Sequence, residues 1–116
     1  MTSRIASLLL VVVVGLAAGC GDDDAVGLDG VTVGGACEDE RDCEFRCEDG
    51  DHFPDGTCTL PCNIDDDCPI GTYCINREDG ICLLGCEHPA DCRDGYSCEG
   101  EENRGHGGDS LVCIRD

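Results

Sequence analysis

The feature that most constrains this chain is a pattern of four cysteines that occurs three times. In the clearest copy the cysteines are separated by five, five and seven residues; they are Cys62, Cys68, Cys74 and Cys82. The next copy has separations of five, five and fourteen residues and contains Cys86, Cys92, Cys98 and Cys113. A looser copy comes first, with separations of five, three and ten residues, and contains Cys37, Cys43, Cys47 and Cys58. Such a recurrence indicates an internal repeat in which each copy is one small structural unit.

The repeats contain too few apolar side chains to hold a fold together unaided. Of the 77 residues from Cys37 to Cys113, 13 are large and apolar. A chain this acidic with so small a core is expected to be disordered unless it is cross-linked. The twelve cysteines of the repeats allow six disulfides. Because a disulfide that closes a loop of about 15 residues contributes roughly 3 kcal/mol, covalent bridges are expected to carry the fold.

Each copy is predicted to hold at most one short β-hairpin and otherwise loop. Gly71 and Gly95 each stand three residues before a third cysteine. There we expect a turn with positive φ, followed by a short strand that holds Tyr73 or Tyr96 against a bridge. The last loop of each copy has residue pairs typical of hairpin tips: Asp55-Gly56, Asp79-Gly80 and Gly107-Gly108. The predicted fold is small and disulfide-rich, with three tandem four-cysteine repeats over residues 37–58, 62–82 and 86–113.

The N-terminal segment has the organisation of an export signal. Arg4 precedes an apolar stretch of 14 residues from Ile5 to Ala18, and small residues close the stretch. It is shorter than the ~20 residues that span a bilayer comfortably. Residues 1–19 are therefore predicted to be a helical signal peptide that is removed, not a permanent transmembrane helix.

Cys20 directly follows these small residues, and the segment from Leu16 to Cys20 resembles the lipobox of bacterial lipoproteins. It departs from the family pattern at Ala17, where leucine is preferred. The resemblance implies cleavage before Cys20, a diacylglyceryl group on its thiol, and further acylation with chains such as palmitate. The cysteine count agrees, because 13 cysteines without Cys20 leave twelve for the repeats. An ordinary secretory signal with a spare Cys20 is the alternative.

Residues 20–36 are predicted to be a disordered, acidic and glycine-rich tether. Residues 21–36 include five glycines and four aspartates, and a flexible coil of this length would span about 20–25 Å. Gly21, rather than an aspartate, follows Cys20. By the sorting pattern known for some Gram-negative lipoproteins, this favours the outer membrane. We therefore expect an exported protein of the cell envelope, lipid-anchored in the outer membrane and facing the periplasm or the exterior.

The second and third copies resemble the N-terminal cysteine-rich region of Dickkopf-type proteins, and similar modules recur in cysteine-rich lipoproteins of deltaproteobacteria. The resemblance rests on the spacing C-x5-C-x5-C, with Asp67 or Asp91 before the second cysteine and Gly71 or Gly95 before the third. It covers residues 62–113 well and residues 37–58 poorly. It implies that the first cysteine pairs with the third and the second with the fourth. The implied bridges are Cys37–Cys47, Cys43–Cys58, Cys62–Cys74, Cys68–Cys82, Cys86–Cys98 and Cys92–Cys113. From the residues alone, three pairings per repeat stay open.

The charge and the cysteine spacing argue against several classes of partner. A net charge of −19 repels nucleic acid and anionic headgroups, so no nucleic acid and no membrane contact besides the lipid anchor are expected. Zinc is not predicted, because no C-x-x-C occurs and export places the thiols in an oxidising compartment. No cofactor is expected. The weak calcium candidates match no calcium-loop motif; they are Asp49, Asp51, Asp55, Asp65, Asp66 and Asp67.

No catalytic arrangement is evident, since His52, His88 and His106 fall in different repeats and no nucleophile motif or phosphate loop occurs. The chain is therefore not expected to be an enzyme. The leading hypothesis is a lipid-anchored, non-catalytic binding or structural module at the cell surface, whose partner is an unknown protein or envelope component. The alternatives are a calcium-dependent interaction module and a secreted protease-inhibitor-like scaffold. The inhibitor would insert one of three loop arginines into an enzyme: Arg46, Arg77 or Arg104.

Overall fold

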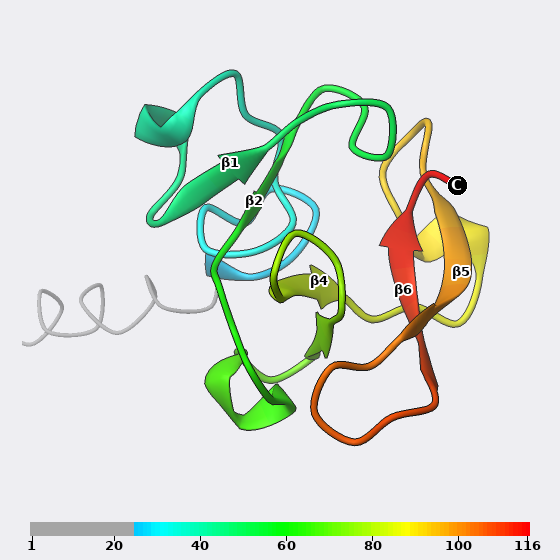
Figure 1. Cartoon of the computed structure of the whole chain (residues 1–116). Helices are drawn as coiled ribbons and strands as arrows, with labels where there is room; N and C mark the ends of the chain where they lie inside the picture. The colour runs from blue at the N-terminus through cyan, green and yellow to red at the C-terminus, as the bar shows by residue number, and fades with distance from the viewer. Residues whose placement is uncertain (1–24) are drawn as a thin grey trace, which may run out of the picture.

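The computed structural model describes residues 25–116, so the predicted signal peptide and Cys20 lie outside the described residues. Within this part, three antiparallel hairpins follow one another, and the second lies between the other two (Figure 1). The strands are β1 (Arg46–Glu48), β2 (Thr57–Thr59), β3 (Thr72–Ile75), β4 (Ile81–Leu84), β5 (Ser97–Glu102) and β6 (Asp109–Ile114). A short 3-10 turn precedes each hairpin: η4 (Glu40–Asp42), η5 (Asp65–Asp67) and η6 (Pro89–Asp91). This confirms the predicted fold class.

The aspartate before the second cysteine has the same structural role in every copy. Asp42, Asp67 and Asp91 each end a 3-10 turn, and each carboxylate accepts two backbone N–H groups from the start of that turn. For Asp91 the donors are Glu87 at 2.9 Å and His88 at 3.1 Å. These two hydrogen bonds hold the pKa of Asp91 below its usual range. Its contribution to stability is therefore present at neutral pH and is lost as the pH falls through that lowered pKa.

Six disulfides, two in each repeat, tie the turns to the hairpins. The third and fourth cysteines of a repeat face each other across its hairpin, yet each bonds to an earlier cysteine, so the two bridges cross. The Cα atoms of the pairs are 5.4–6.0 Å apart, the usual range for disulfides. The pairs are those that the resemblance implies, in the first repeat as well: Cys37–Cys47, Cys43–Cys58, Cys62–Cys74, Cys68–Cys82, Cys86–Cys98 and Cys92–Cys113.

The three repeats share one hydrophobic core. Phe53 of the first repeat packs with residues of both other repeats in a single cluster. The other members of that cluster are Ile75, Ile81, Leu83, Cys92, Tyr96, Val112, Cys113 and Ile114. Four of the thirteen large apolar residues, Ile75, Ile81, Leu83 and Val112, are at most 2% exposed. The described part of the chain therefore packs as one unit, although every disulfide stays within its own repeat.

The prediction of a disordered tether over residues 20–36 is wrong for residues 25–36. Val33 is 1% exposed and packs on three cysteines of the second repeat. The backbone also pairs with β2, since Gly34 N donates to Cys58 O at 2.9 Å and Cys58 N donates to Gly35 O at 2.8 Å. Gly34 has a φ of 112°, and a Cβ there would lie 2.2 Å from Gly27 O. The glycines that suggested flexibility instead permit a tightly folded segment.

The two tyrosines of the hairpins face opposite ways, so the prediction that both pack against a bridge is wrong for Tyr73. Tyr96 stands two residues before its third cysteine and is 9% exposed, whereas Tyr73 stands one residue before its own and is 39% exposed. Successive side chains of a strand point to opposite faces. Thr72, which occupies the position equivalent to Tyr96, is accordingly buried.

The buried Tyr96 should make the protein sensitive to alkaline pH. Its hydroxyl donates to Gly56 O at 3.3 Å, and the Arg93 guanidinium lies 4.7 Å from its ring centre. Burial raises the pKa of Tyr96 above its ordinary value of 10.0. The folded state therefore holds this proton more tightly than the unfolded state, and the free energy of unfolding should fall as the pH rises above 10.

This prediction can be measured by urea unfolding between pH 8 and 11.5. Tyr96→Phe should lower stability at pH 8 and flatten the alkaline decline. Tyr73→Phe, on the exposed side of β3, is the matched control and should keep the decline of the original protein. An unchanged decline in Tyr96→Phe would contradict the assignment.

Candidate functional site

An open groove of about 590 Å³ lies where the hairpin β3–β4 meets β6. Backbone of the second repeat forms one side, and the outer end of β6 forms the other. The residues that line it are Gly71, Tyr73, Gly85, Cys86, Glu87, Asp91, Asp109, Ser110 and Leu111. It combines exposed apolar side chains with carboxylates.

The apolar part of the groove is built on a rigid backbone junction. Gly85 pairs with Val112 of β6 as an isolated bridge, and Cys86 N donates to Leu111 O at 3.2 Å. The Tyr73 ring lies on Gly85, because a Cβ on that glycine would come within 2.7 Å of a ring carbon. Tyr73 and Leu111 remain 39% and 49% exposed. Two large apolar side chains are thus exposed to solvent, and the backbone beneath them is fixed by hydrogen bonds between the repeats.

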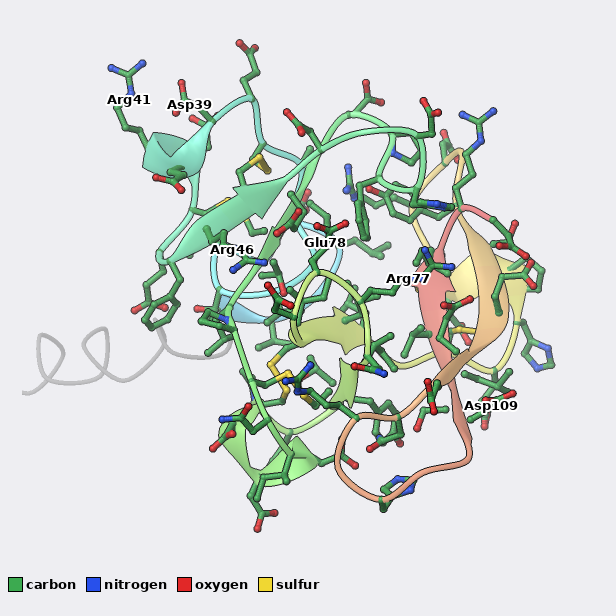
Figure 2. All side chains as sticks on the ribbon, viewed as in Figure 1. Asp39, Arg41, Arg46, Arg77, Glu78 and Asp109 are labelled. Carbon is green, nitrogen blue, oxygen red and sulfur yellow. A yellow bond between two sulfur atoms is a disulfide. The ribbon has the colours of Figure 1, made fainter. Side chains whose placement is uncertain are left out.

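The polar part of the groove is acidic. Glu87 and Asp91 come from the third repeat's turn, and Asp109 begins β6, at the right-hand side of Figure 2. The backbone hydrogen bonds described above fix the Asp91 carboxylate in position. No arginine of the described residues lines the groove. Its negative potential is therefore uncompensated, and the site favours a cationic ligand over an anionic one.

Sequence reasoning missed this groove, although one signal pointed to it. Leu111 and Val112 are adjacent apolar residues in a strand, and alternation allows only one of them to enter the core. Val112 is fully buried and Leu111 is half exposed. The exposed member of such a pair is a candidate for surface binding. Nothing in the sequence shows that Tyr73, from another repeat, lies beside it.

Two of the arginines predicted to act in protease inhibition are held in contacts within the chain. Arg46 Nε donates to Glu48 at 2.7 Å, and Arg46 Nη2 donates to the carbonyl of Glu78 in the next repeat at 3.3 Å (Figure 2). Arg77 Nε donates to Glu101 at 2.6 Å, and this partner raises the pKa of Arg77. Both side chains are about 30% exposed. An inhibitory loop needs a side chain free to enter an enzyme, so these contacts argue against that role.

The third arginine, Arg104, is also held by contacts within the chain. Arg104 Nη1 donates to Asn76 Oδ1 at 3.1 Å, and its side chain lies against Gly80. Its backbone N–H donates to Cys74 O at 2.9 Å. The structure thus uses Arg104 to hold the third repeat's long loop on the second repeat.

The aspartate run of the second repeat is largely occupied by structural hydrogen bonds. Asp67 ends η5, as described. Asp65 Oδ1 accepts from Cys74 N at 2.8 Å and from Asn103 Nδ2 at 2.9 Å. Asp66 is exposed beside them. These bonds take up carboxylate oxygens that a calcium ion would need.

The described residues contain three groups of side chains close enough to share a metal ion, and all nine members are cysteines. Each of these cysteines is in a disulfide, so it has no thiolate to offer. None of the six aspartates proposed for calcium belongs to such a group, including the loop residues Asp49, Asp51 and Asp55. Calcium binding by these aspartates stays a prediction without a preformed site.

The three histidines do not meet. His52 Nδ1 lies 2.7 Å from Arg115 O, at the end of the chain. His88 precedes η6. His106 lies in the loop between β5 and β6, and its Nε2 is 3.6 Å from Asp65 Oδ2. The three histidines therefore form no shared site among the described residues.

Comparison with known proteins adds no identity to this geometry. No protein-family model, curated protein or solved structure matches the chain. Among residues 25–116, no helix is both long enough and apolar enough to cross a membrane.

Proposed function

We propose that this chain is an exported lipoprotein that binds a basic partner protein through the groove between β3–β4 and β6. The groove carries the proposal, because it pairs exposed apolar side chains with uncompensated carboxylates. The lipobox-like sequence at Cys20 supports the anchor. The six disulfides support export, since such bridges persist in oxidising compartments. A non-enzymatic role fits the absence of a catalytic arrangement among the described residues.

The groove suits a lysine or arginine flanked by an apolar residue. Glu87 and Asp109 would attract the cation, and the Tyr73 ring offers a cation–π contact beside them. Leu111 would cover the apolar neighbour. Because disulfides and the shared core hold these groups in place, little conformational entropy is lost on binding. Such a partner would be a protein or envelope component with a basic patch.

The sequence supports a location in the cell envelope. Gly21 after Cys20 favours the outer membrane, with the module facing the periplasm or the exterior. Acyl chains on Cys20 would give a stable anchor, whereas one chain alone binds only marginally.

Mass spectrometry of the native protein tests the anchor. The mature chain should begin at Cys20, carry acyl groups there and contain no free thiol among the other twelve cysteines. Cys20→Ser should release the protein from the membrane fraction. An intact N-terminus at Met1, or an unmodified Cys20, would refute the anchor.

The groove can be tested with paired substitutions in the full-length protein. Asp109→Asn with Leu111→Ser removes one carboxylate and one apolar side chain from the groove, so capture of a basic envelope protein should fall at least tenfold. Asp94→Asn with Ile70→Ser makes the same chemical changes at two exposed positions outside it and should bind normally.

Binding should also weaken in high salt, because the contact is partly electrostatic. Affinity capture followed by quantitative mass spectrometry measures both effects. Equal capture by the groove variant and the control would show that the partner binds elsewhere.

A further inference from the structure

We propose that Val31 and Phe45 form a second membrane contact, which orients the anchored protein on the bilayer. This inference rests on the proposed lipid anchor at Cys20. It concerns a different surface from the groove and a different ligand, the lipid bilayer, and it departs from the expectation that the lipid anchor is the sole membrane contact.

A backbone hydrogen bond holds Val31 beside the residue that precedes Phe45. In this bond, Glu44 N donates to Val31 O at 2.7 Å. The Thr32 hydroxyl also bonds to the Glu44 carboxylate. Val31 is 49% exposed and Phe45 is 52% exposed. An aromatic and an aliphatic side chain therefore project from one small, fixed region.

This region lies close along the chain to the proposed anchor. Ala25, the first residue that the structure describes, is five residues after Cys20. Five residues span at most about 18 Å even when fully extended. The anchor therefore keeps the N-terminal part of the fold, including Val31, near the lipid surface at all times.

A weak apolar contact is sufficient under these conditions. The anchor already restricts the protein to the membrane surface, so inserting Phe45 is an intramolecular step with a high effective concentration. Aromatic side chains are favoured at the boundary between headgroups and acyl chains. The acidic surface of the protein would oppose an anionic bilayer, so the contact should be strongest on zwitterionic lipid.

The orientation that follows leaves the groove accessible. In Figure 1 the start of β1, which follows Phe45, lies at the left edge of the fold, and the start of β6 lies at the lower right. Asp109, labelled in Figure 2, is on that right-hand side. With Val31 and Phe45 on the bilayer, the groove would face away from it.

The chain contains no tryptophan, so a single introduced tryptophan reports its own environment. Phe45→Trp and Tyr73→Trp are prepared as acylated full-length proteins and reconstituted into phosphatidylcholine vesicles. Quenching by brominated acyl chains is then measured. The tryptophan at position 45 should be quenched at least threefold more than the tryptophan at position 73, and raising the fraction of anionic lipid should reduce that quenching.

Equal or negligible quenching at both positions would overturn the inference. A blue-shifted tryptophan at position 45 that depends on protein concentration but not on bromine would also overturn it, because a second copy of the chain would then cover the patch. If Cys20 is found unmodified, the proposed anchor fails by itself. The free thiol can then be coupled to a maleimide lipid, and the same quenching comparison still decides the role of Phe45.

Discussion

Removing the disulfide between Cys92 and Cys113 should cost about 4 kcal/mol of stability. Its loop of 21 residues is the longest of the six, and closing it contributes roughly 3 kcal/mol in the chain-entropy model. Both cysteines also belong to the shared core, so their replacement by alanine removes packing as well. Since small domains have a net stability of about 5–15 kcal/mol, this loss is a large fraction of the total.

Urea unfolding without reductant measures this loss. The Cys37–Cys47 pair is the matched control, because it closes a loop of 10 residues and lies outside both core clusters. Replacing it with alanines should cost about 2.5 kcal/mol. If this control loses as much stability as the Cys92/Cys113 variant, the longer loop and the core position of the Cys92–Cys113 bridge add nothing to its contribution to stability.

Asn103→Ala should lower the free energy of unfolding by about 3 kcal/mol, a large effect for one polar side chain. Asn103 is 1% exposed, and its amide donates to Asp65 Oδ1 at 2.9 Å and to Ser110 Oγ at 3.2 Å. Its carbonyl accepts from Gly105 N at 2.9 Å and from His106 N at 3.1 Å. Alanine would remove all four hydrogen bonds, and of these partners Asp65 Oδ1 would keep another donor, Cys74 N.

The control for this prediction is Asn76→Ala. Asn76 also bonds across the two repeats, to Glu102 at 3.2 Å and from Arg104 at 3.1 Å, but its side chain is exposed. Water can replace those bonds, so the loss should be about 0.5 kcal/mol. Chemical unfolding of both variants gives the comparison. Similar losses of stability in the two variants would mean that the burial of Asn103 does not increase the contribution of its hydrogen bonds.

Asn103 also explains why the third copy has the longest last loop. It forms an isolated bridge with Ile75, while Asn76 N donates to Glu102 O at 2.9 Å. The additional residues let the end of β5 and the following turn fold back onto the second hairpin. The fourteen-residue spacing before Cys113 therefore provides the residues that bind the third repeat to the second.

The local parts of the fold were predictable because they depend on short spacings. The glycines at 71 and 95 do have positive φ, of 93° and 87°, and each last loop forms a hairpin. The contacts between repeats were not predictable, because hairpin geometry does not say which faces meet. Tyr73 and Tyr96 show this, since a shift of one residue sends one ring to the groove and the other to the core. Asn103 gave no sequence signal of its burial.

The segment from Ala25 to Ala36 shows the limit of composition as a guide. Its four glycines are typical of flexible linkers, and the sequence contains no long apolar pattern there. Val33 nevertheless fills a site formed by the second repeat. A single apolar residue can order a glycine-rich segment when the glycines allow the backbone to approach its neighbours closely.

The crossed bridges have a consequence for proteolysis. A cut inside any repeat leaves the two fragments joined by a disulfide, whereas a cut between Cys58 and Cys62, or between Cys82 and Cys86, separates them covalently. Both short connections begin with buried residues, Thr59 at 0% and Leu83 at 2% exposed, and Thr59 Oγ1 donates to Cys82 O at 2.5 Å. The first residue of each connection where cleavage would divide the molecule is thus shielded from a protease.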